Sequence, residues 1–371
     1  MMNGQWIGPY TGSSDGQLVV NIDERQDCYE GVAYLNESNL QIPTTIAHFK
    51  TKNKDAEFQC DTDLILSFDP TSANAVPWET VKKAYPDNIS VSKRATVNGS
   101  LTDSTLKLSW TTDIPQVHGT ALLPRSEADK PSKLPTEEKD WHGFKQYVCS
   151  IETRKFLFRG QNRPWRLRTS FHRAGRTYLE RFLRDDVPGL YRHLSARTKH
   201  VFNLAIPEQN GAFYNLVQHH GYPTPLLDWT YSPYVAAFFA YRGITNEASE
   251  SALPTDKVRV IVFDQAEWRT WTQLSHLVMP GLHVSIQEFL AIENERMIPQ
   301  QAASTITNVD DIESYITTKS KSTEYLSAID LPVSDRGKVM RELGYMGITA
   351  GALFPGLDGA CEELKERNFK P

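Results

Sequence analysis

With 371 residues, the chain is longer than one ordinary hydrophobic core supports, so we expect two domains. Its 40% hydrophobic and 23% charged residues are typical of globular proteins, and its net charge of -5 argues against a chain that coats nucleic acid over its whole surface. No apolar run reaches the roughly 18 residues that span a bilayer, and the first residues lack the basic and apolar regions of a secretory signal. We therefore expect no membrane partner.

The cysteines favour a reducing compartment. Cys28, Cys60, Cys149 and Cys361 lie far apart, and no two of them have Cys-x-x-Cys spacing. A zinc knuckle or a disulfide framework would need closer or patterned cysteines. The sequence therefore predicts reduced thiols, a cytoplasmic location and no bound metal.

Residues 1–124 have the pattern of a β-rich domain. Short segments rich in β-branched or aromatic residues alternate with Gly, Asp and Asn, which favours strands joined by turns. The expected strands are 17–22, 29–35, 44–51, 64–68, 95–97, 106–111 and 116–122. Such spacing predicts an antiparallel β sandwich or a small barrel, which we expect to act as a sensor or targeting domain.

A linker is expected over residues 125–140, where the segment 124–139 holds three prolines, many charges and almost no apolar side chains. The second domain is expected over residues 141–371. It combines a strand-like segment at 155–158, a central strand at 258–263 and helices at 175–183, 190–202, 210–218, 232–241 and 335–343. The whole chain is therefore predicted to be an α+β protein, with mixed α/β structure in its second domain.

Basic residues are concentrated between Arg154 and Arg184, a segment that contains ten Lys or Arg and a single acid, Glu180. Arg173, Arg176, Arg181 and Arg184 are expected on a solvated helix face. Four others alternate with apolar residues and are expected to form a partly buried cationic wall; they are Arg159, Arg163, Arg166 and Arg168. Such a wall would attract a phosphate-bearing ligand.

Two segments carry most of the functional signal. In Phe158-Arg159-Gly160-Gln161, the Arg ends a strand-like segment and offers a fixed fork of donors for phosphate or carboxylate, while the Gly permits close approach. The second segment is Gln218-His219-His220-Gly221, followed by Pro225-Leu226-Leu227-Asp228-Trp229-Thr230 and Ser232-Pro233. Polar groups that follow apolar strands in this way are typical of a site carried on strand ends.

Together these segments resemble the FRG-domain family, and the resemblance extends from about residue 141 to 363. A further matching block is Leu353-Phe354-Pro355-Gly356-Leu357-Asp358-Gly359. The family's Arg…Gln-x-Gly-x-Phe block is altered, since Arg296 and Gln300 remain but Ala302 and Ser304 stand where Gly and Phe are expected. The resemblance implies a C-terminal FRG domain and leaves its biochemistry open.

A second pattern consists of a strand that ends in aromatic-Arg-Gly, then Thr-x-Ser-Pro leading into Ala-Ala-Phe-Phe-Ala, then an acidic residue before a strand-like segment. This pattern is similar to ADP-ribosyltransferases of the Arg/Ser/Glu type, and the resemblance implies NAD as substrate. By that resemblance, Arg159 would hold the diphosphate with Gln161 beside it, and Thr230 and Ser232 would form the polar strand end. Glu293 or Glu295 would be the carboxylate that stabilises the developing ribosyl cation. The chain departs from the family in having no Ser-Thr-Ser and no clean Glu-x-Glu strand.

Structural roles compete with these functional ones. Arg159 could form a buried bridge with Asp228, which needs a partner if buried. His219 and His220 could be a general base and a ribose contact, or structural histidines. Ser232 also suits a helix N-cap.

Two hypotheses follow. In the first, an FRG-domain effector binds NAD or a related nucleotide in a cationic cleft and transfers or hydrolyses ADP-ribose. In the second, the domain is a non-catalytic nucleotide- or nucleic-acid-binding module, and the β domain contacts a protein partner. Either would suit a toxin or an anti-viral effector, by analogy of architecture.

Overall fold

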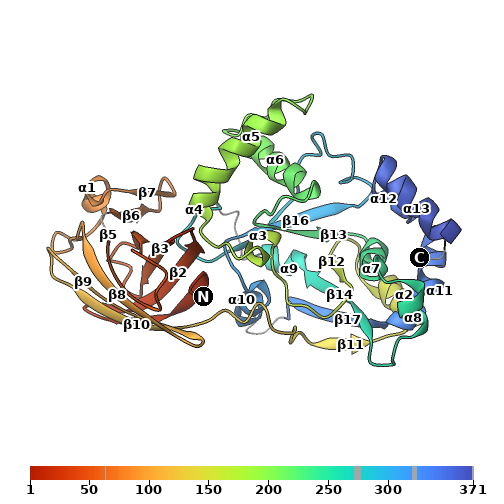
Figure 1. Ribbon diagram of the computed structural model, residues 1–371, viewed down its shortest axis with the longest axis horizontal. Helices are drawn as coiled ribbons and strands as arrows, with labels where there is room; N and C mark the ends of the chain where they lie inside the picture. The colour runs from red at the N-terminus through yellow and green to blue at the C-terminus, as the bar shows by residue number, and fades with distance from the viewer. Residues whose placement is uncertain (63, 271–276, 320–323, 370–371) are drawn as a thin grey trace.

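The computed structural model describes residues 1–371 except 63, 271–276, 320–323 and 370–371. Its strands form two sheets that follow one another along the chain, a ten-stranded sheet and a seven-stranded sheet (Figure 1). Helices are concentrated around the second sheet (Figure 1). The predicted α+β class, with antiparallel β structure first and mixed α/β structure second, is confirmed.

The first sheet is antiparallel throughout and has the order β5-β8-β9-β10-β1-β2-β3-β4-β6-β7. Its strands are β1 (Gly4–Gly12), β2 (Gly16–Glu24), β3 (Tyr29–Glu37), β4 (Thr45–Lys50), β5 (Glu57–Thr62), β6 (Leu64–Asp69), β7 (Asn74–Val76), β8 (Ala95–Thr102), β9 (Thr105–Thr112) and β10 (His118–Pro124). Between described residues, the edge strands β5 and β7 do not pair with each other, so the sheet curls without closing into a barrel.

Strand β2 shows why this sheet has an apolar sequence on both faces. Leu18, Val20 and Ile22 point into an interior cluster that also contains Trp6. Val19 points the other way, into a second cluster that contains Tyr178 from the C-terminal half of the chain. Because alternate residues of a strand face opposite sides, burial of both faces replaces the usual alternation of apolar and polar residues.

The second sheet has the order β11-β17-β14-β12-β13-β16-β15 and is antiparallel except for the pair β11–β17. Its strands are β11 (Thr136–Glu138), β12 (Phe156–Gln161), β13 (Leu226–Thr230), β14 (Lys257–Asp264), β15 (Val284–Gln287), β16 (Ala302–Thr307) and β17 (Leu326–Pro332). The predicted central strand 258–263 is therefore β14, and the C-terminal end of the predicted linker joins this sheet as β11.

Helices cover both faces of the second sheet. Its principal helices are α2 (Trp141–Ser150), α6 (Pro207–His219), α7 (Pro233–Tyr241), α10 (Ile312–Lys319), α11 (Arg336–Tyr345), α12 (Ala350–Leu353) and α13 (Leu357–Phe369). One core joins α7 to Trp141 of α2 and Val339 of α11, and another joins Leu157 of β12 to Ile312 of α10. In the described part of the chain, no helix has both the length and the apolar character needed to cross a membrane.

Two predicted helices differ from the observed ones. The helix expected over 175–183 begins only at Leu179, as α4 (Leu179–Arg181), and continues through a π-helical turn into α5 (Val187–Ser195). It begins late because the backbone N–H groups of Thr177 and Tyr178 donate to the Asp23 carboxylate instead of to a helical carbonyl. The helix expected over 190–202 ends at Ser195.

Asp23 also joins the two halves of the molecule. Its carboxylate is fully buried and accepts hydrogen bonds from Arg176 Nε at 2.7 Å and Arg181 Nη1 at 3.0 Å. Nearby, the Gln5 side-chain amide bonds to the backbone of Asn308 and Asp310. The outer face of the curled sheet is thus fixed to the second half by polar contacts as well as by apolar ones.

Candidate functional site

A cavity with a volume of about 500 Å³ lies where β12 and β13 meet the surrounding helices. The two strands are antiparallel neighbours, with Phe158 opposite Thr230. The cavity is also lined by the end of α6, the end of α7, the segment 296–302 and the start of α13. Its polar lining residues are Arg159, Gln218, His219, Asp228, Thr230, Arg242, Arg296, Gln300, Asp358 and Glu362.

Gly160 allows the cavity to form because helix α7 lies directly against β12. A Cβ atom at Gly160 would stand 1.8 Å from the carbonyl oxygen of Ala236 and 2.5 Å from the backbone nitrogen of Ala240. Only a residue without a side chain permits this approach of strand and helix. In the Phe-Arg-Gly sequence, Gly160 therefore contacts helix α7, and the preceding residue, Arg159, lines the cavity.

Arg159 is a largely buried cation with an incomplete set of partners. Its Nη1 donates to the backbone carbonyl of Asp228 at 2.6 Å, and its Nε is buried without a hydrogen-bond partner among the described residues. It forms no ion pair with any carboxylate that the structure describes. Burial lowers the pKa of Arg159 to about 10, although the Asp228 charge opposes this change. The guanidinium stays charged at neutral pH and has donors to spare.

Asp228 supplies a carboxylate to the same cavity, and a chain of side chains orients it. Asp228 Oδ1 accepts a hydrogen bond from Gln218 Nε2, while Gln218 Oε1 accepts one from the Thr224 hydroxyl. Ser304 Oγ is a further, weaker donor at 3.5 Å. The described hydrogen-bond partners of this carboxylate are therefore neutral groups, and none of them is a cation.

His219 is held at the cavity wall by an asparagine pair. Asn294 Nδ2 donates to Asn215 Oδ1 at 2.6 Å, which leaves Asn294 Oδ1, 2.9 Å from His219 Nδ1, as an acceptor. Asn294 Nδ2 lies 2.6 Å from the same ring nitrogen, so the amide orients the imidazole without fixing which nitrogen carries the proton. The Nε2 of His219 makes no hydrogen bond to a described residue and can contact a ligand.

Two further arginines flank Phe354 at the opposite wall. The guanidinium carbon of Arg242 is 3.9 Å from the centre of the Phe354 ring, and that of Arg296 is 5.5 Å from it. Arg242 is neutralised by two 2.7 Å hydrogen bonds to the Glu362 carboxylate. Arg296 donates to the backbone carbonyl of His219 at 2.9 Å and has no described carboxylate partner. The cavity thus holds two cations, Arg159 and Arg296, that an anion could approach.

The part of the chain that carries β12, α6 and β13 matches a known protein family. Residues 154–249 match the FRG domain. The chain contains an FRG domain. No curated protein and no solved structure matches the chain.

The FRG match covers Arg159, His219 and Asp228 but ends before Arg296 and Gln300, which line the same cavity. The sequence prediction extended the domain over residues 141–371, a wider range than the match. Strands β16 and β17, beyond the matched residues, belong to the same sheet as β12 and β13.

Four residues predicted for nucleotide binding meet in the FRG-domain cavity. Arg159, His219, Asp228 and Thr230 all line it. The Thr230 hydroxyl donates to the backbone carbonyl of Gln300 at 2.7 Å, so it also fixes the segment that carries Arg296. The strand-end pattern was therefore a good guide to which side chains lie together.

Three other predicted residues do not line the cavity. His220 is the exposed C-cap of α6, and Gln161 lies one residue beyond Gly160, opposite Arg259 of β14. Ser232 is the N-cap of α7, where its hydroxyl accepts a hydrogen bond from the backbone of Val235 at 3.2 Å. This capping role is the alternative that the Ser-Pro sequence indicated.

The structure does not bring the predicted acids Glu293 and Glu295 to Arg159. Both are exposed and neither lines the cavity. Glu293 has a positive φ of 58° and its carboxylate accepts a hydrogen bond from the backbone of His200 at 2.8 Å. The turn therefore directs Arg296 and Gln300 inward and the two acids outward, and the half-buried Asp228 is a carboxylate that lines the cavity and influences the charge of Arg159.

Several lining residues were not assigned a role from the sequence. Arg242 and Phe239 lie at the end of an apolar helix, and Phe354 was named only as part of a block in the family resemblance. These residues reach the cavity through the packing of α7 against α12 and α13, with Phe239 and Phe354 in edge-to-face contact at 5.9 Å. The block Leu353 to Gly359, which was part of the family resemblance, was the signal that could have found Phe354.

The predicted cationic wall is divided among different partners. Arg166 and Arg168 form ion pairs with Asp311 at 2.8 Å and Asp310 at 2.5 Å. Arg163 is exposed and does not line the cavity. The arginines expected on a solvated helix include Arg176 and Arg181, which instead hold Asp23. The later arginines of this segment, Arg176, Arg181 and Arg184, therefore join the two halves of the chain, whereas Arg166 and Arg168 pair within the second half.

Proposed function

We propose that the FRG-domain cavity binds NAD or a related nucleotide, with its phosphates on Arg159. The observation that carries this proposal is that the buried Nε of the Arg159 guanidinium has no hydrogen-bond partner among the described residues. An unpaired buried charge is costly, and a phosphate would supply both the counter-charge and the missing acceptor. Arg296, which also lines the cavity and has no carboxylate partner among the described residues, would hold a second phosphate oxygen.

The remaining lining residues suit the other parts of a nucleotide. Phe239 and Phe354 offer half-buried aromatic surface for a base or a nicotinamide ring. The Asp228 carboxylate and the free nitrogen of His219 are acceptors for ribose hydroxyls. The cavity volume of about 500 Å³ lies within the range of small-molecule sites.

A reaction at this site would use Asp228. Cleavage of the bond between C1′ of the ribose and the nicotinamide nitrogen sends its electron pair to the nitrogen and builds positive charge on the ribose. Asp228 would stabilise that charge more strongly in the transition state than in the ground state. Water or an acceptor hydroxyl would then bond to C1′ and lose its proton. The products would be nicotinamide and ADP-ribose, free or attached to the acceptor.

The alternative function is a non-catalytic module that binds a nucleotide or a nucleic-acid end. It is favoured by the positions of Glu293 and Glu295 outside the cavity and by the hydrogen bond that already occupies one Asp228 oxygen. In that case the β domain would direct the module to a protein partner.

One experiment separates the two. NAD, ADP-ribose and ADP are titrated calorimetrically into the wild type, Arg159→Ala and Arg163→Ala, and nicotinamide release is followed by chromatography. We expect Arg159→Ala to weaken NAD binding at least tenfold and Arg163→Ala, an exposed arginine of the same segment, to leave it unchanged. Binding without nicotinamide release would favour the non-catalytic module. Equal binding by wild type and Arg159→Ala would exclude this site for the nucleotide.

A further inference from the structure

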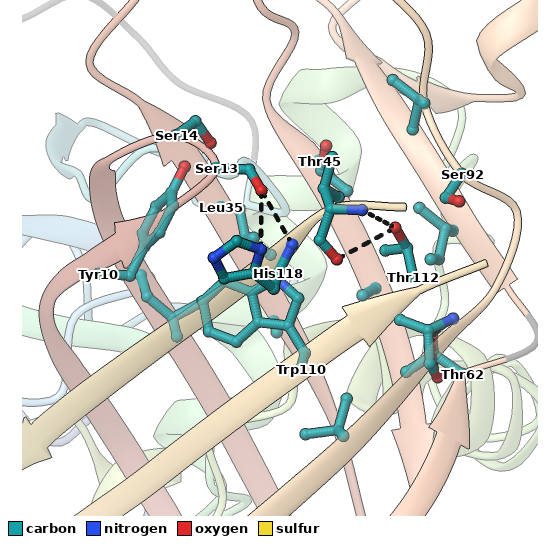
Figure 2. A pocket seen from close by; sticks show the side chains of 18 of the residues that line it. Tyr10, Ser13, Ser14, Leu35, Thr45, Thr62, Ser92, Trp110, Thr112 and His118 are labelled. Carbon is teal, nitrogen blue, oxygen red and sulfur yellow. Dashed lines mark hydrogen bonds between the residues drawn. The ribbon is translucent and has the colours of Figure 1, made fainter. Parts of the chain in front are cut away.

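A second cavity lies inside the curled N-terminal sheet, far along the chain from the FRG-domain cavity. Its volume is about 340 Å³, and its walls come from β1 to β6 and β8 to β10 together with the segment 88–92 (Figure 2). Residues of β5, at one edge of the sheet, and of β6, next to the other edge, line the same space. The sheet thus wraps around the cavity.

Most of the wall is apolar and belongs to the best-buried part of the sheet. Leu18, Val20, Ile22 and Leu106 line the cavity and have exposed fractions of 2% or less. Apolar side chains that line a cavity of this size gain contacts and lose water-exposed surface when an apolar molecule binds there. The wall therefore suits an apolar occupant.

Three cross-strand pairs keep aromatic side chains against the wall. Phe49 lies opposite Gly31, Phe58 opposite Gly99 and Trp110 opposite Gly119. A Cβ atom at Gly99 or Gly119 would stand 2.2 Å from the facing ring, so these rings lie directly on the glycine backbone. Any larger residue would displace the ring. The glycines consequently leave room in the middle of the cavity that the rings would otherwise occupy.

One part of the cavity is polar. Tyr10, which is 2% exposed, and Glu37 line it together, and the Tyr10 hydroxyl and Glu37 Oε2 are each buried without a well-formed hydrogen bond in the described residues. The other Glu37 oxygen accepts a hydrogen bond from the Ser14 hydroxyl at 3.1 Å. Ser13 and His118 form a neighbouring pair at 3.3 Å (Figure 2). The Tyr10 hydroxyl and the Glu37 carboxylate lie close enough to influence the pKa of each other, and because neither of these two atoms makes a well-formed bond, a ligand group can bond between them.

The charge of the lining limits which group this can be. No Lys or Arg occurs among the described lining residues, and Glu37 is the one residue among them with a carboxylate. Burial raises the pKa of Glu37, and its neighbours include Tyr10 and Asp15. A ligand carboxylate or phosphate would therefore find no Lys or Arg here to offset its charge. A hydroxyl or amine could instead donate to Glu37 Oε2 or to the Tyr10 oxygen.

We propose that the curled sheet binds a small apolar molecule that carries a hydrogen-bond donor and no negative charge. The apolar part lies between the aromatic rings and the β2 side chains, and the donor group bonds to Glu37 and Tyr10. This site is separate from the FRG-domain cavity, so its occupancy does not depend on the nucleotide function proposed above.

Binding is tested with the full chain and the neutral fluorescent probe N-phenyl-1-naphthylamine. Its displacement is measured for 1-octanol, 1-decanol, decylamine and decanoate. We expect one probe molecule per chain, displacement by 1-decanol and decylamine, and at least tenfold weaker displacement by decanoate. Each added methylene should strengthen alcohol binding roughly fourfold while the apolar part of the cavity is being filled.

Two variants and a control locate the site. Leu108→Trp fills the cavity and should abolish probe binding, whereas Leu122→Trp, on β10 with 63% of its surface exposed, should not change it. Tyr10→Phe keeps the shape and should reduce the preference for 1-decanol over decanoate at least threefold, which keeps the proposal testable if Leu108→Trp fails to fold. Unchanged probe binding in a folded Leu108→Trp protein, or decanoate binding as tight as that of 1-decanol, would overturn the proposal.

Discussion

The guanidinium of Arg159 is hydrogen-bonded to the main chain of Asp228, at 2.6 Å from its carbonyl oxygen, whereas the Asp228 carboxylate is bonded to Gln218. Two opposite charges on neighbouring strands therefore share one cavity without neutralising each other. A closed ion pair would have left neither group for a ligand. This arrangement keeps both a cation and an anion accessible for chemistry.

The separation of these charges predicts opposite effects on binding and turnover in Asp228→Asn. The amide oxygen can still accept the Gln218 hydrogen bond, so the fold should be retained. Loss of the negative charge should leave NAD affinity unchanged or raise it up to fivefold. If Asp228 stabilises the ribosyl cation, nicotinamide release should fall at least about a hundredfold, as expected for loss of one group that stabilises transition-state charge. Asp358→Asn, at an exposed acid of the same cavity, should change both quantities less than threefold.

We expect Arg159 to destabilise the fold of the ligand-free protein. Arg159→Met removes a buried charge that has no carboxylate partner, so we expect the free energy of unfolding to stay equal or rise by up to about 2 kcal/mol while nucleotide binding is lost. Arg166→Met provides the contrast, because Arg166 is 6% exposed and paired with Asp311 at 2.8 Å. That variant should lose about 3–5 kcal/mol in urea unfolding. A large loss in Arg159→Met would mean that the residue is structural.

The sequence predicted those residues of the FRG-domain cavity whose positions follow from the local sequence pattern. Arg159, Asp228 and Thr230 were found because each lies in a short strand segment ended by a motif, and such segments adopt their structure largely from local sequence. Glu293 and Glu295 were assigned through the resemblance to ADP-ribosyltransferases, but a turn with a positive φ at Glu293 directs them outward. Arg242 reaches the cavity through the packing of helix α7, which no local pattern encodes, whereas Phe354 lies in a block that the family resemblance included. The contact of Asp23 with Arg176, 153 residues apart, was invisible for the same reason.

Asp23 should be a sensitive buried contact between the two halves of the chain. Asp23→Ala leaves Arg176 and Arg181 without the carboxylate they share and two backbone N–H groups without an acceptor. We expect a loss of about 3–5 kcal/mol in the free energy of unfolding, measured with urea. Asp27→Ala removes an exposed acid from the same region and should change stability by less than about 0.5 kcal/mol. Equal stability of the two variants would contradict a structural role for Asp23.

Two buried histidines should make the protein sensitive to acid. Burial lowers the pKa of His172 and of His283 to about 4, whereas the unfolded chain binds these protons near pH 6.5. Their neutral forms therefore stabilise the fold above pH 6.5, and this contribution is lost as the pH falls towards 4. Each should cost about 2 kcal/mol between pH 7.5 and pH 5.0. Urea unfolding at both pH values should show a smaller difference for His172→Asn than for the wild type.

Gly160→Ala tests whether the close packing of helix α7 on strand β12 shapes the FRG-domain cavity, because the substitution adds a single methyl group at that contact. In Gly160→Ala the new Cβ would overlap the Ala236 carbonyl, and backbone on both sides prevents a small local adjustment. Helix α7 must then move away from β12, which we expect to cost about 1–3 kcal/mol or more.

The same movement should carry Arg242 and Phe239 away from Arg159, so Gly160→Ala should weaken nucleotide binding even at temperatures where the protein stays folded. Gly337→Ala is the matched control, since nothing lies within 4 Å of a Cβ at that position in α11. There the change should stabilise the protein by about 0.4–1 kcal/mol, because alanine restricts the unfolded chain more than glycine does. If both variants bind the nucleotide like the wild type, close packing of α7 on β12 is not what shapes the cavity.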